Sequence, residues 1–236
     1  MENYICKTCG TQFPATAVPP EHCLICEDER QYIGWEGQQW TTLMELQANH
    51  QNKIEDEEPN LTGIGTTPGF AISQRALLVQ TPQGNLLWDC ITLLDEETKT
   101  AVNALGGIDA IAISHPHYYS SMIEWAHAFN APIYLHAADQ QWVMRPDTAV
   151  HFWEGESKSL WDGLTLIRGG GHYAGGTILH WPAGANGAGV LVTGDIIQVV
   201  PDRRWVSFMY SYPNLIPLPA KKVREIVAAV APYDFE

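Results

Sequence analysis

The hydrophobic and polar positions along the chain predict short strands and amphipathic helices from about residue 60 onward. Two apolar runs, 76–80 and 86–89, flank a Pro-Gln-Gly-Asn turn and predict a β-hairpin. The apolar run 108–113 predicts a buried strand. Further strands are predicted at 133–135, 164–167, 177–181 and 190–193, and helices at 96–105, 121–129 and 221–230.

The order of these elements indicates the fold class. Strand pairs come first, strands alternating with helices follow, and strand pairs with a helix come last. This succession favours mixed sheets covered by helices, which is an α/β (α+β) architecture. We expect residues 60–236 to form one domain of this kind.

The N-terminal quarter of the chain has a different character. Residues 1–40 hold short β-like segments and four of the five cysteines, which predicts a small ribbon domain. Residues 41–52 are helix-like, and the acidic run 55–59 ends in a proline and predicts a solvated linker. We therefore expect residues 41–59 to join the two domains through a helix and an acidic linker.

Composition and charge exclude several classes of partner. Thirteen Lys and Arg stand against 27 Asp and Glu, for a net charge of −14. Nucleic acids and anionic membranes both bind basic surfaces, so we expect neither as a partner. No apolar run approaches the ~20 residues of a membrane-spanning helix, and the first residues lack the features of a signal peptide. The expected location is the cytoplasm.

Four cysteines form two closely spaced pairs, Cys6 with Cys9 and Cys23 with Cys26. Two residues between thiolates let one tight turn present both sulfurs to an ion, and four thiolates complete a tetrahedral site. We expect a structural zinc, because cytoplasmic proteins rarely form disulfides. A rubredoxin-like iron is an alternative, although Glu27 follows the second pair where rubredoxins usually have a glycine. Two disulfides or free thiols are the remaining interpretation.

A ribbon of this size cannot build a sizeable hydrophobic core. Its bound metal must therefore supply much of its folding energy. We also expect that such a module could dock a protein partner.

Three histidines and one aspartate follow the ends of predicted strands. His115 and His117 follow one strand, His172 lies in a glycine-rich loop after another, and Asp195 follows a third. In an extended segment, residues two apart point to the same side, so we expect the imidazoles of His115 and His117 to reach one ion. Four such side chains at three strand ends predict a metal site.

These motifs resemble those of the metallo-β-lactamase-fold superfamily over residues 60–236. That superfamily carries a His-x-His-x-Asp-His motif after a buried strand, a later Gly-His loop and a later strand-end Asp. The matching positions here are His115, His117, His172 and Asp195. The resemblance implies an αββα sandwich, with two mixed sheets face to face and helices outside, and an active-site metal.

The chain departs from the superfamily at the second metal site. Tyr119 and Ser120 stand where the Asp-His pair would supply ligands, and residues 196–236 contain no histidine to match the last ligand. The resemblance thus implies one intact metal site and a largely lost second one. The final strand and helix of the superfamily have no counterpart, so we expect the C-terminal end of the domain to be incomplete.

The expected function is a metal-dependent hydrolase for an ester, thioester or lactone of a small molecule. An active-site zinc with about three protein ligands lowers the pKa of its bound water. Asp195 is the expected fourth ligand or proton acceptor. Tyr118, Tyr119 and Tyr173 could donate hydrogen bonds to a substrate oxyanion, although packing is the simpler role for each tyrosine.

Two further functions remain open. In the first, one iron held by His115, His172 and Asp195, or a pair of irons, makes the protein an oxidoreductase with the ribbon as its redox module. In the second, the protein is a non-catalytic member of the superfamily that binds a metal or ligand. The lost Asp-His pair motivates this second alternative.

Overall fold

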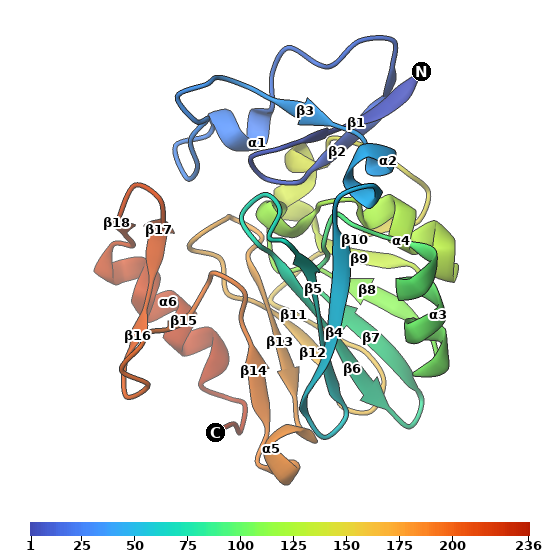
Figure 1. Cartoon of the computed structure of the whole chain (residues 1–236). Helices are drawn as coiled ribbons and strands as arrows, with labels where there is room; N and C mark the ends of the chain where they lie inside the picture. Colours follow the sequence, from blue (N-terminus) through green and yellow to red (C-terminus); the bar gives the residue numbers. More distant parts are fainter.

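The computed structural model describes all residues from 1 to 236 and has two parts, a small ribbon and a larger body of two sheets (Figure 1). The ribbon sheet has the strand order β2-β1-β3. Its elements are β1 (Glu2–Cys6), β2 (Gln12–Thr16), α1 (Leu24–Glu27) and β3 (Trp40–Thr41). The core of the ribbon consists of its four cysteines together with Phe13 and Ile25.

The larger sheet of the body has seven strands in the order β10-β9-β8-β7-β6-β5-β4. Neighbours from β4 to β7 are antiparallel, whereas β7 to β10 run parallel. Helices α3 (Glu96–Ala104) and α4 (Met122–Phe129) connect the parallel strands, which need such crossovers. The strands are β4 (Gln51–Glu58), β5 (Leu61–Thr67), β6 (Arg75–Thr81), β7 (Gly84–Trp88), β8 (Ala110–Ala112), β9 (Ile133–His136) and β10 (Val150–Trp153).

The second sheet has four antiparallel strands in chain order, followed by two hairpins and the last helix. Its strands are β11 (Ser157–Ser159), β12 (Thr165–Arg168), β13 (Thr177–Trp181) and β14 (Val190–Val192). The hairpins and last helix are β15 (Gln198–Val199) with β16 (Val206–Ser207), β17 (Met209–Ser211) with β18 (Ile216–Pro217), and α6 (Ala220–Val230). Short helical turns complete the body: η1 (Pro116–Tyr118), η2 (Ala137–Trp142) and α5 (Gly184–Gly187).

Successive residues of the central strands serve two different cores. In β6, Leu78 packs on the side of α3 and α4, while Val79 packs between the two sheets. In β7, Leu87 packs on the side of α3 and α4, and Trp88 packs between the two sheets. Because both faces of these strands are buried, their sequences form continuous apolar runs rather than an alternation with polar residues.

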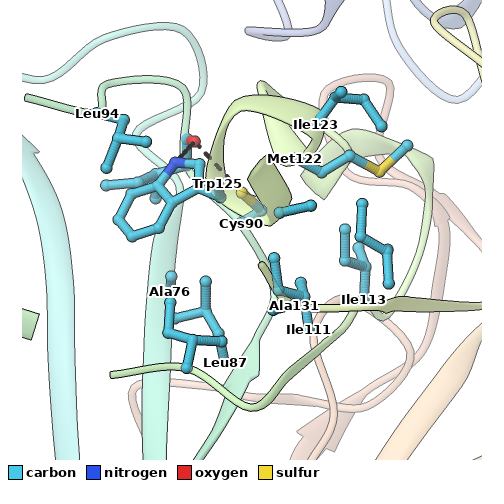
Figure 2. Packing of buried hydrophobic residues seen from close by; sticks show 14 of the residues in the cluster. Ala76, Leu87, Cys90, Leu94, Ile111, Ile113, Met122, Ile123, Trp125 and Ala131 are labelled. Atoms are coloured by element: carbon cyan, nitrogen blue, oxygen red, sulfur yellow. Dashed lines mark hydrogen bonds between the residues drawn. The ribbon is translucent and has the colours of Figure 1, made fainter. Parts of the chain in front are cut away.

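Three hydrophobic clusters hold the layers of the body together. The first lies under α3 and α4 and includes Trp125, whose indole N–H donates to the carbonyl of Ile91 at 3.0 Å (Figure 2). The second lies between the sheets. In the third, Ile226 of α6 packs on Ile178 of β13. The layers therefore follow the order α-β-β-α, which confirms the predicted sandwich.

The segment before the body differs from the prediction. Helix α2 spans only Leu43–Gln47, and its N-cap Thr42 accepts the N–H of Glu45. The acidic residues after it are not a linker, because residues 51–58 form β4 and pair with β5 along its length. Alternate residues at the start of β4 are partly buried, a pattern that its acidic composition concealed.

Candidate metal centre

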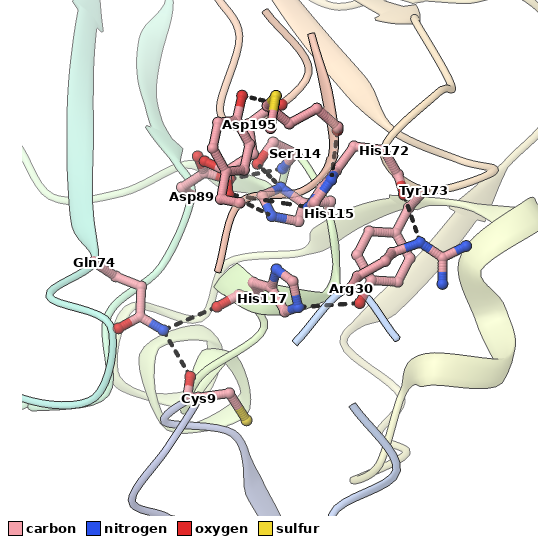
Figure 3. Close-up of polar contacts among 12 residues, drawn as sticks. Cys9, Arg30, Gln74, Asp89, Ser114, His115, His117, His172, Tyr173 and Asp195 are labelled. Carbon is pink, nitrogen blue, oxygen red and sulfur yellow. Dashed lines mark hydrogen bonds and ion pairs between the residues drawn. The ribbon is translucent and has the colours of Figure 1, made fainter. Parts of the chain in front are cut away.

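Four side chains that follow the ends of three strands converge where both sheets face the ribbon. His115 follows β8, His117 lies in η1, His172 follows β12, and Asp195 follows β14 (Figure 3). The potential ligand atoms of these four residues all lie within 4.8 Å of one another. The structure thus brings together the four residues that the sequence pointed to as one metal-binding group.

The hydrogen bonds of two histidines leave one ring nitrogen of each free. His172 donates from Nδ1 to the carbonyl oxygen of Met209 at 3.1 Å, and Nδ1 of His115 pairs with Oγ of Ser114 at 2.9 Å. Nε2 of both rings is buried and has no hydrogen-bond partner. These nitrogens lie 3.6 Å (His115) and 4.0 Å (His172) from Oδ2 of Asp195. Buried polar atoms without partners call for an explanation, and a bound cation provides one.

The third histidine is held by a tyrosine. Nε2 of His117 lies 3.1 Å from the hydroxyl of Tyr173, which leaves Nδ1 of His117 as the nitrogen available to a metal. Metal-binding histidines usually have such a partner on the second ring nitrogen, because it fixes the orientation of the ring. The donor set therefore fits a metal with three imidazole ligands and one carboxylate.

The protonation states of these groups suit metal binding. Burial and the neighbouring imidazoles lower the pKa of His117 well below its usual range, and burial lowers the pKa of His172 to about 3. For Asp195, burial acts to raise the pKa, but the surrounding histidines lower it to about 2 overall. Neutral imidazoles and an ionised carboxylate are the forms that bind metals.

Only the aspartate of this group reaches solvent to a marked extent. The side chain of Asp195 is 28% exposed, whereas those of His115 and His172 are at most 1% exposed. Asp195, His117 and His172 line a cavity of about 370 Å³. Residues from distant parts of the chain complete its wall: Arg30, Gln31 and Tyr32 of the ribbon, Ile72, Tyr118, Gln198, Tyr212 and Pro213.

Neither Tyr119 nor Tyr173 lines this cavity. Tyr119 is 2% exposed and belongs to the cluster under α3 and α4, so the prediction that it serves the site is not supported by its position. Burial raises the pKa of its hydroxyl well above the usual range. Its neighbour Tyr118 lines the cavity instead. Tyr173 is fully buried, with its hydroxyl directed at His117.

The local conformation around the first two histidines explains this outcome. Residues 116–118 form a 3-10 turn, so the expectation of an extended segment was wrong. The imidazoles of His115 and His117 nevertheless meet, with ring centroids 5.2 Å apart. The turn leaves Tyr118 at the cavity and Tyr119 in the core, so of these two adjacent candidates only Tyr118 lines the site.

The four cysteines form a second, separate group. All are buried, unpaired by disulfides, and have their sulfurs within 4.8 Å of one another. Sγ of Cys6 lies 3.6 Å from that of Cys26, and Sγ of Cys9 lies 3.7 Å from that of Cys23. A tetrahedron with metal–sulfur bonds of about 2.3 Å has edges of about 3.8 Å. The geometry therefore fits a four-thiolate metal site and not two disulfides.

Three residues of the centre were missed in the sequence. Asp89 ends the β7 run and accepts the N–H of Ser114 at 2.7 Å, and burial raises its pKa to about 7. The signal available in the sequence for Asp89 was its position as a carboxylate directly after the apolar run 86–88. Arg30 and Gln74 also contact the histidine loops, but no local pattern marks them, since their partners are far away in the sequence.

Comparison with known proteins places this geometry in context. No protein-family model matches the chain. The uncharacterized protein YmaE of Bacillus subtilis (strain 168) is 57% identical over 237 residues, which cover 100% of this chain and 86% of YmaE.

Solved structures of metallo-β-lactamases share the fold. The DIM-1 metallo-β-lactamase exposed to ceftazidime aligns with a TM-score of 0.58 and 16% identity over 78% of this chain and 84% of its own. VMB-1 aligns with a TM-score of 0.57 and 13% identity over 78% and 84% of the two chains. No helix of this chain is long and apolar enough to cross a membrane.

The identity with YmaE and the likeness to these solved structures show that the chain belongs to the family of YmaE and has the metallo-β-lactamase fold, with a four-cysteine ribbon at its N-terminal side.

Proposed function

We propose that the protein is a metal-dependent hydrolase that uses a single zinc ion held by His115, His117 and His172. The observation that carries this proposal is the pair of buried Nε2 atoms without partners beside the partly exposed carboxylate of Asp195. A zinc ion in this place would supply a water of lowered pKa and polarise a substrate carbonyl. The proposed substrate is a small ester, thioester or lactone.

The residues of the chain have separate roles in this proposal. The three histidines hold the metal and are oriented by Ser114, Tyr173 and the carbonyl of Met209. Asp195 either completes the metal site or accepts the proton of the attacking water, and its low pKa keeps it ionised for both roles. The hydroxyl of Tyr212 donates to the backbone carbonyl of Asp195 at 3.1 Å and supports this loop.

The surroundings favour one metal ion over two. Tyr119 is in the core, and Oγ of Ser120 donates to the carbonyl of Cys90 at 3.2 Å. Neither residue therefore replaces the Asp-His pair that holds a second metal in relatives of this fold. The ligand group contains four residues, which is enough for one zinc ion that uses all four, or that uses three and leaves one position open.

The cavity is suited to a small molecule. Its volume of about 370 Å³ is near the lower end of the range for ligand sites. The ribbon forms one wall and the segment 198–213 forms another, so a large polymer would have to displace one of them. Tyr32, Tyr118 and Tyr212 give this cavity flat apolar surfaces beside polar groups.

The test combines metal analysis with an activity panel on the full chain. Mass spectrometry of the purified protein should find two zinc ions, and His115→Ala and His172→Ala should each retain only the ion of the cysteines. Both variants should lose turnover of esters, thioesters or lactones, whereas His151→Ala, at an exposed histidine outside the site, should retain it.

Other outcomes would contradict the proposal. Iron in the histidine site, lost in the same two variants, would favour the oxidoreductase alternative. A zinc-loaded protein that is inactive on the whole panel would favour a non-catalytic binding protein. Two ions in the histidine site would show that the chain supplies ligands other than those proposed.

A further inference from the structure

The ribbon contacts the histidine site through several specific hydrogen bonds. Gln74, which lies before β6, is 6% exposed and donates both hydrogens of its side-chain amide. One bond goes to the carbonyl of Cys9 at 2.6 Å, and the other goes to the carbonyl of His117 at 2.9 Å (Figure 3). A single side chain thus bridges the backbone of a cysteine ligand and the backbone of a histidine ligand.

A second contact comes from the other side of the ribbon. Arg30 follows the second cysteine pair, and its Nε donates to the carbonyl of His172 at 2.6 Å. Its guanidinium lies 4.4 Å above the ring of Tyr173, the residue that holds His117. Asp28 pairs with the same guanidinium at 2.6 Å. Nε and Nη1 of Arg30 are therefore engaged by His172 and Asp28, and the same residue lines the cavity beside the histidines.

Two further hydrogen bonds hold the first cysteine turn and the residue after it against the segments that follow β7 and η1. The N–H of Gln12 donates to the carbonyl of Ser120 at 2.9 Å, and Thr92 donates to the carbonyl of Gly10 at 3.0 Å. Gly10 has φ of +79°, and a Cβ there would lie 2.3 Å from Oγ1 of Thr92. The close approach thus depends on the positive-φ turn that follows Cys9.

The hairpin β17–β18 in turn holds the segment around Arg30 by hydrogen bonds. Oγ of Ser211 donates to the carbonyl of Arg30, and the amide of Asn214 donates to the carbonyl of Glu29, both at 3.0 Å. The carbonyl of Met209 in the same hairpin accepts from His172. The ribbon, this hairpin and the histidine loop therefore form one connected hydrogen-bonded unit.

We propose that the four-cysteine ribbon regulates the histidine site, because metal bound by the cysteines fixes Gln74 and Arg30 in the positions that hold His117 and His172. This inference rests on the proposed function only in that the histidine group binds a metal. Without the cysteine-bound metal, the two turns lose their fixed shape, since a ribbon this small depends on its metal for folding. Loss of that metal then lowers the affinity of the histidine site. Linkage requires the same coupling factor in the opposite direction.

The test uses cobalt(II) in the full chain, because the two sites then give different spectra. A four-thiolate cobalt site has strong sulfur-to-metal charge-transfer bands, which a histidine and carboxylate site lacks. Titration of the metal-free protein against a chromophoric chelator therefore gives the affinity of each site separately. Gln74→Ala should keep the charge-transfer bands of the ribbon and lower the affinity of the histidine site by about tenfold or more, as loss of supporting contacts around metal ligands typically does.

Matched variants make the result specific. Asn3→Ala removes another side-chain amide bond of the ribbon, from Asn3 to the carbonyl of Phe13 at 2.8 Å, without touching the histidine loops, and should leave the histidine site unchanged. Arg30→Met should act as Gln74→Ala does and shift the visible bands of the histidine-bound cobalt. Arg30→Lys should restore part of the affinity, because an ammonium can still donate to the carbonyl of His172.

The outcomes separate this inference from the proposed function. If the unaltered protein binds cobalt only at the cysteines, the proposed function fails. If it binds two cobalt ions and Gln74→Ala and Arg30→Met leave the affinity and spectrum of the histidine site unchanged, the regulatory inference fails and the proposed function stands. A Cys23→Ser variant extends the test where it folds, and should weaken the histidine site by a similar factor.

Discussion

The hydroxyl of Tyr173 and Nε2 of His117 lie 3.1 Å apart in the interior of the protein, and both residues are almost completely buried. This bond decides which nitrogen of His117 remains available to a metal. The Tyr173 ring also packs edge-on against Trp142, with centroids 5.6 Å apart. Tyr173 is therefore placed to orient His117, the proposed metal ligand, and it does not line the cavity.

Replacement of this tyrosine by phenylalanine tests that role. Tyr173→Phe keeps the ring and its packing but removes the bond to His117, so the imidazole loses its fixed orientation. We expect about a tenfold or larger loss of zinc affinity at the histidine site and a loss of only ~1 kcal/mol in the free energy of unfolding. Competition with a zinc chelator and urea unfolding measure the two quantities. Tyr134→Phe, in β9, is the control, and an unchanged affinity in Tyr173→Phe would refute the role.

The carboxylate of Asp195 is open to a direct test by amidation. Asp195→Asn removes the negative charge at nearly constant volume. In the proposed mechanism, the water would then lose its proton acceptor, or the zinc would lose a ligand. We expect the turnover rate on the best substrate of the panel to fall by about 10² to 10⁴. Metal analysis of the same variant separates the roles, since loss of zinc indicates a ligand and retention indicates a proton acceptor. An unchanged rate would exclude both.

Tyr119 provides a contrast between packing and catalysis. Because its ring lies in the core under α4, Tyr119→Phe should leave hydrolytic activity unchanged. Tyr119→Ala should instead lower the free energy of unfolding by about 3–5 kcal/mol, because it leaves a large cavity. Steady-state kinetics and chemical denaturation measure these effects. A large loss of turnover in the folded Tyr119→Phe protein would show that the Tyr119 hydroxyl takes part in catalysis.

Asp139 should make stability depend on pH. Burial raises the pKa of its carboxyl to about 6, above the value of about 3.9 for an unfolded chain. Its contribution to stability is therefore complete below pH ~4 and is lost as the pH rises through about 6. Asn in its place cannot ionise, and its oxygen can still accept the N–H of Gly175.

Denaturation of Asp139→Asn and the unaltered protein at several pH values measures this effect. The difference in unfolding free energy between the two proteins should grow in favour of the variant from pH 4 to pH 7, by on the order of 1–3 kcal/mol. Taking the difference cancels the contributions of other carboxylates. A difference that stays constant over this range would contradict the raised pKa.

The sequence allowed much of the body to be predicted because its central strands are buried on both faces. Apolar runs such as 76–80 and 177–181 match β6 and β13 closely. The strand β4 was missed because it faces another layer on one side only, and its acidic residues resemble those of a linker. Composition describes what a segment exposes, and it does not reveal backbone pairing with a distant strand.

The candidate site could be predicted as a set of residues but not as a geometry. Histidines and an aspartate at strand ends carry a local signal, and they do converge. The position of Tyr118 at the cavity and of Tyr119 in the core depends on a single 3-10 turn, which the spacing of motifs cannot reveal. Arg30 reaches His172 across 142 positions of sequence, so only the folded chain shows that the ribbon forms part of the site.

The acidic strand β4 also has a consequence for the behaviour of the protein in a crowded solution. β4 is the last strand of the seven-stranded order, so one side of its backbone has no strand neighbour. An open sheet edge of this kind invites pairing with another copy and growth into aggregates. Four carboxylates against one lysine along Gln51–Glu58 make two such edges repel each other. The acidic residues that resembled a linker thus disfavour pairing between the β4 edges of separate molecules.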